Sequence, residues 1–255
     1  MAALPMGLQL YSIREECARD LPGSLKAVRK MGYDGVEFAG YYGYSATDLR
    51  RMLDDNGLKC CGTHTGFTSL LDDELPRTIE YNQTLGNPYL IVPALPEKYR
   101  DSNAAWIKVA QQFNQIAERL APLDMYTGYH NHFVEFKPIA GDATGGGVPF
   151  DLFFANTSPR VIMQVDLGNA MVGGGDPLAC LRRYPGRALT VHLKEYSAAD
   201  PKALIGDGEV DWPEVFRLCE TSGNTRWYIV EYESDAYPPL ESVARCRANL
   251  RKLGR

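Results

Sequence analysis

Hydrophobic and polar positions divide the chain into two alternating kinds of segment. One kind is a short, nearly continuous apolar run, as at residues 88–95. The other kind repeats apolar residues at steps of three and four. In residues 102–123 this spacing places Trp106, Val109 and Phe113 on one face of a helix. The pattern therefore predicts strands that alternate with amphipathic helices.

Eight strand–helix units follow one another along the chain. The expected strands are residues 6–13, 33–40, 58–67, 88–95, 125–136, 160–170, 187–197 and 226–234. The expected helices are residues 20–32, 45–57, 73–86, 102–123, 149–157, 176–186, 211–223 and 238–254. Apolar runs of this kind are typical of parallel strands that helices cover on both sides. Eight such units predict one α/β domain over residues 1–255, a (β/α)8 TIM barrel.

A doubly wound open sheet is the alternative fold. It would more often have fewer units and a glycine-rich phosphate-binding motif directly after the first strand. This chain has the sequence SIREECARD at residues 12–20 instead. The barrel is therefore the preferred prediction.

Composition narrows the class of protein. The 255 residues are 45% hydrophobic and 23% charged, as in an ordinary globular protein, and the net charge of −5 argues against a nucleic-acid partner. The six cysteines show no CxxC spacing, the first residues do not resemble a secretion leader, and no apolar run approaches the ~18 residues of a membrane span. We expect a cytoplasmic protein with no membrane partner, and the sequence leaves a homo-oligomer open.

The four histidines all lie in the second half of an expected strand. They are His64, His130, His132 and His192. In a TIM barrel, catalytic groups come from the carboxyl ends of the strands and from the loops that follow. A single histidine at such a position is more often a structural residue. Four of them at the same end of one barrel indicate a shared site.

Ionisable residues repeat this placement. Glu37, Asp166, Lys194 and Glu231 each follow an apolar stretch of an expected strand. A buried carboxylate is costly unless it is paired or binds a metal. Asp166, His192 and Glu231 lie on three consecutive strands. With one histidine of the fifth strand they provide four donors for one divalent ion, Mn²⁺, Co²⁺, Mg²⁺ or Zn²⁺.

Three further charged residues have simpler interpretations. Lys194 and Glu195 are neighbours in a strand, so their side chains point to opposite faces and only one of them is expected inside the barrel. Glu135 is interpreted as a solvated loop charge. Glu233 shares a face with Glu231 but lies further out, so a role at the rim and a functional role both stay open.

Several motifs resemble the xylose isomerase-like barrel superfamily. They are GLQLYSIRE, GYDGVEF, GYHNHFVEF, VDLGNAMVGGGDP, HLKEY, IGDGEVDWPEVF and YIVEYE, and they run from Gly7 to about Glu233. The superfamily includes sugar phosphate isomerases/epimerases, inosose dehydratase and endonuclease-IV-like proteins. The resemblance implies a metal set of Glu, Asp, His and Glu on strands five to eight.

The chain matches three of these four ligands and departs at the first. Asp166, His192 and Glu231 match by motif, whereas His130 stands where many members have a glutamate. The resemblance therefore implies His130 as the metal ligand and His132 as a residue facing the substrate, and the opposite assignment stays open. A second departure is Asn169, where a histidine often follows the strand-six aspartate.

These residues suggest a divalent-metal-dependent isomerase or epimerase that acts on a sugar, keto-sugar or sugar phosphate through an enediolate. The ion would chelate a carbonyl and its neighbouring hydroxyl and so acidify the C–H between them. Glu231 or a strand-five histidine would remove that proton as general base. The expected catalytic residues are Glu231, His132 and Lys194, the substrate-binding residues Glu37, His64 and Asn169, and the metal ligands His130, Asp166, His192 and Glu231.

Three other functions remain as alternatives. A metal-dependent lyase or dehydratase acting on a keto-inositol or 3-keto-glycoside is favoured by the HLKEY segment, which resembles inosose dehydratase-type members. A barrel that binds sugar without catalysis is less consistent with a full Asp/His/Glu trio. A phosphodiesterase like endonuclease IV would need a three-metal site, for which four histidines in an acidic chain are too few.

Overall fold

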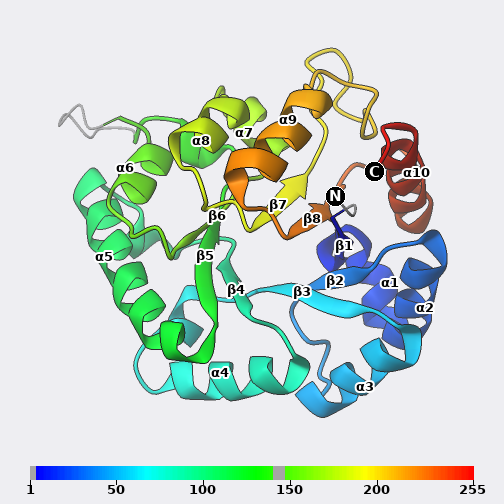
Figure 1. Cartoon of the computed structure of the whole chain (residues 1–255), viewed down its shortest axis with the longest axis horizontal. Helices are drawn as coiled ribbons and strands as arrows, with labels where there is room; N and C mark the ends of the chain where they lie inside the picture. The colour runs from blue at the N-terminus through cyan, green and yellow to red at the C-terminus, as the bar shows by residue number, and fades with distance from the viewer. Residues whose placement is uncertain (1–3, 140–146) are drawn as a thin grey trace.

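Eight short strands occupy the centre of the molecule, and helices surround them (Figure 1). The computed structural model describes residues 4–139 and 147–255. The strands are β1 (Met6–Gln9), β2 (Gly35–Ala39), β3 (Lys59–His64), β4 (Tyr89–Val92), β5 (Tyr126–His130), β6 (Ile162–Gln164), β7 (Thr190–Leu193) and β8 (Trp227–Val230).

The strands form one parallel sheet that curves round almost to meet itself. They pair in the order β6-β5-β4-β3-β2-β1-β8-β7, and each ladder is parallel. The gap between the two end strands is bridged by one parallel pair, Asp166 with His192. The fold is therefore the predicted (β/α)8 barrel, and its seam lies between two residues of the expected metal set.

The helices cover the outside of the sheet. They are α1 (Arg14–Arg19), α2 (Leu21–Met31), α3 (Ala46–Asn56), α4 (Glu74–Leu85), α5 (Asn103–Leu120), α6 (Pro149–Ala155), α7 (Leu167–Val172), α8 (Pro177–Arg183), α9 (Trp212–Leu218) and α10 (Pro239–Lys252). Helix α3 shows the expected start and stop. Ser45 Oγ accepts the N–H of Asp48 at 3.1 Å, and Gly57 ends the helix with φ of 62°.

All eight strands are shorter than the apolar pattern predicts, and two of them lose the most residues at their carboxyl ends. The strand predicted for residues 125–136 ends at His130, and the strand predicted for residues 160–170 ends at Gln164. The prediction is wrong beyond these points because local hydrogen bonds redirect the backbone. Asp166 caps α7 through the N–H of Asn169, so the chain turns into a helix at the carboxyl edge of the barrel.

An aromatic layer packs β5 against α5 and α6. Phe113 of α5 lies edge-on to Phe153 of α6, with ring centroids 4.9 Å apart, and Tyr129 of β5 lies 5.1 Å from Phe153. Trp106 packs edge-on against the same tyrosine at 5.7 Å. Each of these buried rings contributes on the order of 1.5–3 kcal/mol to stability. The layer therefore fixes the strand that carries His130.

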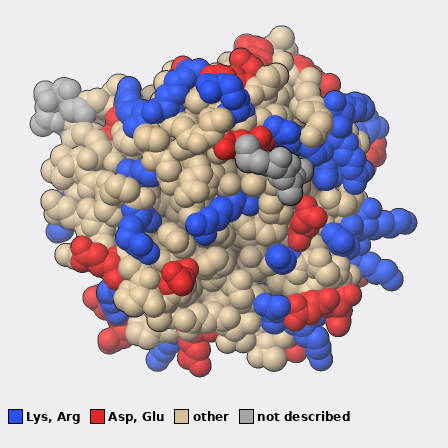
Figure 2. Space-filling model, viewed as in Figure 1, with Lys and Arg blue, Asp and Glu red and all other residues tan. Residues whose placement is uncertain are grey.

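The surface carries both signs of charge. Figure 2, seen from the same side as Figure 1, shows basic and acidic side chains over this face of the molecule. Within residues 4–139 and 147–255, no helix combines the length and the apolar character that a membrane crossing requires.

Candidate metal centre and active site

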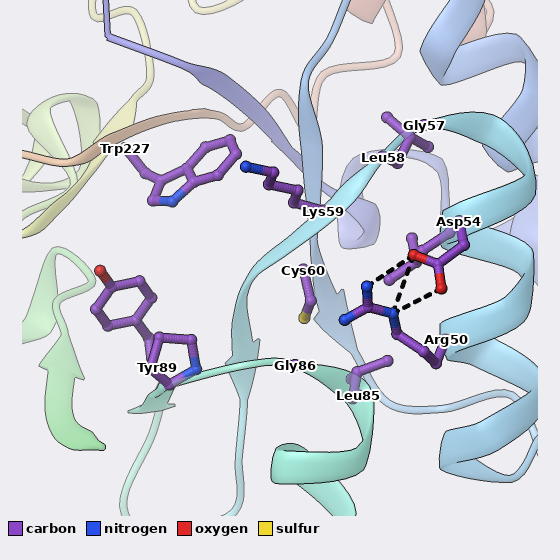
Figure 3. Close-up of a pocket in the computed structure, with 12 residues that line it drawn as sticks. Arg50, Asp54, Gly57, Leu58, Lys59, Cys60, Leu85, Gly86, Tyr89 and Trp227 are labelled. Carbon is purple, nitrogen blue, oxygen red and sulfur yellow. Dashed lines mark hydrogen bonds and ion pairs between the residues drawn. The ribbon is translucent and has the colours of Figure 1, made fainter. Parts of the chain in front are cut away.

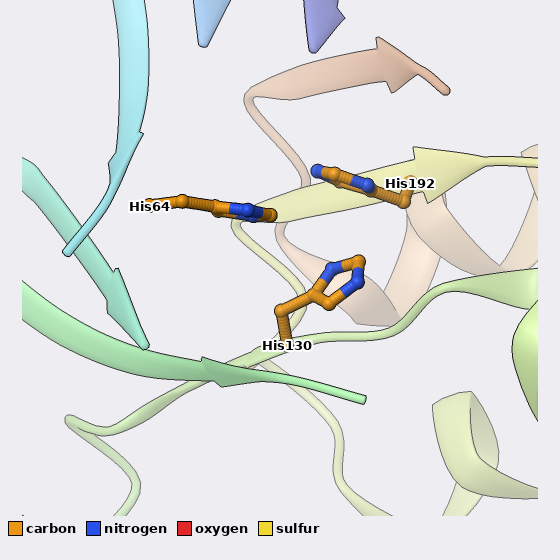
Figure 4. Close-up of side chains that lie close together, drawn as sticks. All are labelled: His64, His130 and His192. Atoms are coloured by element: carbon orange, nitrogen blue, oxygen red, sulfur yellow. The ribbon is translucent and has the colours of Figure 1, made fainter. Parts of the chain in front are cut away.

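Three histidine rings meet at the carboxyl ends of β3, β5 and β7 (Figure 4). The ring centroids of His64 and His130 lie 4.8 Å apart, and those of His130 and His192 lie 4.5 Å apart. The ring of His132, one step beyond β5, lies 5.0 Å from that of His130. The structure thus brings all four histidines of the chain to one end of the barrel.

Four buried side chains form a group that could hold a metal ion. Donor atoms of His130, Asp166, His192 and Glu231 all lie within 4.8 Å of one another. Donors on opposite sides of one ion stand about 4 Å apart, because each bond is about 2.1 Å long. The size of the group therefore suits a single divalent ion. Its members are the four residues that the sequence suggested as ligands.

Asp166 supplies an independent indication that a cation fits here. Its Oδ1 accepts the N–H of Asn169 at 2.7 Å, while its Oδ2 is buried without a hydrogen bond among the described residues. Burial raises the pKa of Asp166 to about 7, and the charge of Glu231 acts in the same direction, against the opposing charges of Lys194 and His192. A divalent ion beside Oδ2 would give this oxygen a partner and favour the ionised carboxylate.

His192 lies between two carboxylates. Its Nδ1 is 2.6 Å from Oε2 of Glu231, and its Nε2 is 2.6 Å from Oε2 of Glu37. Burial lowers its pKa, but the charges and hydrogen bonds of the two glutamates outweigh burial and raise the pKa to about 10. Nδ1 also lies 3.9 Å from Oδ2 of Asp166. This nitrogen therefore faces the other donors, and Nε2 is held from behind by Glu37, as in carboxylate–histidine–metal arrangements.

Glu37 is the centre of a polar layer beneath the four-residue group. Its carboxylate is fully buried and, besides its contact with His192, accepts hydrogen bonds from Gln9 Nε2 at 2.7 Å and Gln164 Nε2 at 2.8 Å. His64 Nε2 lies 3.2 Å from its Oε2. Burial raises the pKa of Glu37, but His64 and His192 together lower it far below its usual range. The structure therefore places this expected substrate-binding residue under the histidines.

The backbone of β2 and β3 makes room for this carboxylate. The register between the two strands shifts between Val36 and Glu37, so that Glu37 pairs with Gly62. A Cβ atom at Gly62 would collide with Oε1 of Glu37. The absence of a side chain at residue 62 is thus a requirement for the buried glutamate.

The amide of Gln164 determines how two histidines are protonated. Its Nε2 donates to Glu37 at 2.8 Å and to Thr190 at 3.0 Å, which leaves Oε1 as the acceptor. Oε1 lies 3.2 Å from Nδ1 of His130 and 3.1 Å from Nε2 of His64. Both nitrogens must therefore carry the proton. His130, whose pKa burial lowers well below its usual value, keeps a free lone pair on Nε2, as a metal ligand requires.

A second possible donor group consists of His64, His130 and His192. In this group the Nε2 atoms of His64 and His192 both contact Oε2 of Glu37. The group that contains Asp166 and Glu231 is therefore the better candidate for a metal ion, because Oδ2 of Asp166 has no hydrogen-bond partner among the described residues.

The turn after β5 presents His132. The buried carboxylate of Glu135 accepts the backbone N–H of His132 at 2.7 Å and the hydroxyl of Tyr129 at 2.8 Å. Glu135 is only 3% exposed, so the interpretation of a solvated loop charge is wrong. Burial lowers the pKa of His132, which favours a neutral ring. The turn thus holds a neutral histidine beside the donor group.

Asn131 joins the ends of β5 and β6. Its Nδ2 donates to the carbonyl of Asp166 at 3.2 Å, and its Oδ1 accepts the N–H of Asp166 at 3.0 Å. The side-chain amide thereby replaces a ladder pair where the strands have ended. It fixes Asp166 relative to His130.

Lys194 and Asn169 lie beside the donor group. Lys194 Nζ is 3.4 Å from Oε1 of Glu231 and 3.1 Å from Oε2 of Glu233. Burial lowers the pKa of Lys194, but Asp166 and its glutamate partners raise it overall. Nδ2 of Asn169 is buried without a hydrogen bond among the described residues.

Glu195 points away from this site. Its carboxylate accepts the indole N–H of Trp212 at 2.9 Å and the backbone N–H of Gly206 at 2.7 Å. As expected, only one of the two neighbours Lys194 and Glu195 contributes to the barrel end.

A cavity of about 610 Å³ opens above the donor group. Its lining includes four residues of the histidine cluster and the donor group, and three residues from the segments after β1 and β8: His64, His130, His132 and Glu231, with Tyr11, Arg14 and Glu233. Cavities of this size are typical of sites for small molecules.

Another cavity, of about 460 Å³, lies at the opposite end of the barrel (Figure 3). Lys59 and Trp227, the first residues of β3 and β8, line it, and Arg50 pairs with Asp54 at 2.8 Å. No histidine is among its described lining residues. Because catalytic groups in TIM barrels lie at the carboxyl ends of the strands, we do not assign the active site here.

Sequence reasoning missed the two glutamines of the polar layer. Gln9 and Gln164 are fully buried inside the barrel. A signal for Gln164 was present, because it stands two positions before Asp166 in an apolar segment. Gln9 interrupts the apolar run of the first strand in the same way.

Glu37→Gln is predicted to weaken metal binding by about 10–100-fold, the usual effect of removing an outer partner of a metal-bound histidine. The amide has nearly the same size but no charge to hold Nε2–H of His192. Titration with Mn²⁺ measures the affinity, and two-bond ¹⁵N–¹H NMR correlations report the histidine tautomers of the metal-free protein. Glu195→Gln, outside the barrel interior, is the matched control. Unchanged affinity together with unchanged tautomers would contradict the orienting role.

The chain is similar to known proteins over most of its length. A family model described as Xylose isomerase-like TIM barrel matches residues 25–253. Inosose dehydratase from Erwinia tasmaniensis is 29% identical over 264 residues, covering 87% of this chain and 86% of that protein. Rhizopine catabolism protein MocC from Rhizobium meliloti is 25% identical over 247 residues, covering 83% of this chain and 74% of that protein.

A solved structure is also similar over its full length. The crystal structure of a sugar phosphate isomerase/epimerase from Parabacteroides distasonis aligns with a TM-score of 0.81 and 27% identity, covering 98% of this chain and 97% of that chain.

Proposed function

Because the chain belongs to the xylose isomerase-like TIM barrel family, we propose that it is a divalent-metal-dependent enzyme that isomerises or epimerises a sugar, keto-sugar or sugar phosphate through an enediolate. The observation that carries this proposal is that Glu231 takes part in both the donor group and the lining of the 610 Å³ cavity above it. A substrate in the cavity would thus meet the ion and a carboxylate together.

The residues around the cavity provide groups that accept and donate protons. Burial raises the pKa of Glu231, but Lys194 and His192 lower it well below its usual range, so this carboxylate is ionised at neutral pH. His132 is kept neutral and lines the same cavity. A bound divalent ion would supply Lewis acidity towards a carbonyl and its neighbouring hydroxyl. Either Glu231 or His132 would remove the proton between them, and Lys194 would hold a hydroxyl oxygen.

A second candidate is a lyase or dehydratase of the same family, acting on a keto-inositol or a 3-keto-glycoside. Two observations favour it. A curated relative at 29% identity is named inosose dehydratase. Lys194 also keeps its proton beside Glu231, where it would protonate a departing hydroxyl or alkoxide after the α-proton has been removed.

Deuterium exchange tests the proposal and separates its two forms. The protein would be loaded with Mn²⁺ or Co²⁺ and incubated in D₂O with ketoses, keto-inositols and 3-keto-glycosides. Deuterium α to the carbonyl in an isomerised or epimerised product would support the first form, and loss of a β-substituent would support the second. A protein that binds no stoichiometric metal, and shows no exchange after addition of Mn²⁺ or Co²⁺, would refute both.

A further inference from the structure

A second cavity adjoins the one above the candidate metal centre. It has a volume of about 390 Å³ and lies between the segment after β1 and the segment after β8. Arg14 and Glu233 line both cavities, so the two spaces meet at these side chains. We call the space above the donor group the inner cavity and the second one the outer cavity. A molecule reacting in the inner cavity could therefore extend past Glu233 into the outer one.

Exposed tyrosines stand at both cavities. Tyr11, 44% exposed, lines the inner cavity, and the guanidinium of Arg14 stacks 4.4 Å from its ring centroid. Tyr237, 36% exposed, lines the outer cavity, and Arg245 stacks 4.0 Å from its ring centroid. A tyrosine held in place in this way offers an apolar face and a polar tip. Such a surface suits a sugar ring or an aromatic aglycone.

The charges of the outer cavity disfavour an anion. Four carboxylates line it, those of Glu15, Glu16, Glu233 and Asp235, and Arg14 is the one cation among its described lining residues. Cations outside the lining already pair with three of these carboxylates: Arg19 with Glu16, Lys194 with Glu233 and Lys202 with Asp235. A phosphate here would compete with these carboxylates for cations that they already hold, and among the described residues it would find only Arg14 without a carboxylate partner. Hydroxyl groups, in contrast, can donate to carboxylates without such competition.

We propose that the outer cavity is a subsite for an uncharged substituent of the reacting sugar, so that the preferred substrate is a keto-glycoside with a second ring. A free or phosphorylated monosaccharide would leave this subsite empty or place an anion among carboxylates. The proposal rests on the proposed function, because it takes the reacting ring to bind in the inner cavity.

The test compares three probes on the Mn²⁺-loaded full chain: a 3-keto-hexose, its 6-phosphate and its phenyl or glucosyl glycoside. Calorimetry measures binding, and deuterium exchange in D₂O measures kcat/KM. The glycoside is expected to bind at least about tenfold more tightly than the free sugar and the phosphate. Tyr237→Ala is expected to lower the ratio of glycoside to free-sugar kcat/KM by about tenfold. Tyr44→Ala, 37% exposed and outside both cavities, is expected to leave that ratio unchanged.

Tighter binding of the phosphate, or no preference for the glycoside, would overturn the subsite. An unchanged ratio in Tyr237→Ala would overturn it as well. The glycoside could bind preferentially, and Tyr237→Ala could abolish that preference, while no probe exchanges deuterium. This result would support the subsite and refute the proposed function. The two failures are therefore distinguishable.

Discussion

Glu231→Gln is expected to lower the rate of deuterium exchange into the substrate by about 10²–10⁴-fold, the contribution of a general base. The same change removes one of four donors and the acceptor for Nδ1 of His192, which lies 2.6 Å away. We therefore also expect weaker Mn²⁺ binding. Exchange should be measured at Mn²⁺ concentrations that saturate the variant, so that the loss of base and the loss of metal are separated.

Glu233→Gln is the matched control for this experiment. Glu233 is the next residue on the same face beyond Glu231, contacts the same lysine at 3.1 Å and lies at the rim. Its replacement should change the metal affinity by less than about threefold, the small effect typical of a solvent-exposed charge pair. If Glu231→Gln retained full exchange at saturating Mn²⁺, Glu231 would not be the base, and His132 would take that role.

The arrangement of strands and helices could be predicted because it depends on patterns that are local in the chain. Continuous apolar runs and capped amphipathic helices alternate eight times. Eight parallel strands that alternate with helices can close into a barrel, with the helices covering its outside. Strand ends were less predictable. The turn after His130 depends on a hydrogen bond from the backbone N–H of His132 to the carboxylate of Glu135, which no periodicity reveals.

The residues of the donor group were predictable for a related reason. In a barrel the carboxyl ends of all strands meet at one face, so Asp166, His192 and Glu231 had to come together once the strands were assigned. How deep each of these polar side chains lies inside the barrel was not predictable. Glu37 was expected to contact substrate, but the register shift at β2 and the missing side chain of Gly62 place it below the histidines.

The polar layer explains why one face can hold so many histidines. Glu37 fixes His192 and His64 directly and His130 through Gln164. An imidazole without such a partner could adopt either tautomer, and in one of them it would present a proton to a bound ion. The layer is an outer support that the sequence shows only as polar residues within apolar strands.

His130→Ala is expected to weaken metal binding, whereas His132→Ala is expected to slow catalysis and leave metal binding nearly unchanged. His130 is fully buried, belongs to the donor group, and has a free lone pair on Nε2 because Gln164 holds its other nitrogen. Its loss should reduce Mn²⁺ affinity by more than about 100-fold, beyond the effect of losing an outer partner. His132 is outside the donor group and lines the cavity. Its loss should leave the affinity within about threefold and slow exchange by about 10²-fold.

Mn²⁺ titration, metal content and exchange at saturating Mn²⁺ should be measured on both variants, with thermal unfolding of the metal-free proteins as the test of folding. His130→Ala removes a buried ring and is expected to unfold at a lower temperature, so only a folded preparation gives a meaningful affinity. The reverse result, with metal lost in His132→Ala and kept in His130→Ala, would assign the ion to His132. In that case the turn held by Glu135, with its N–H contact of 2.7 Å, would be part of the metal site. His130, fixed by Gln164, would then be the group that faces the substrate.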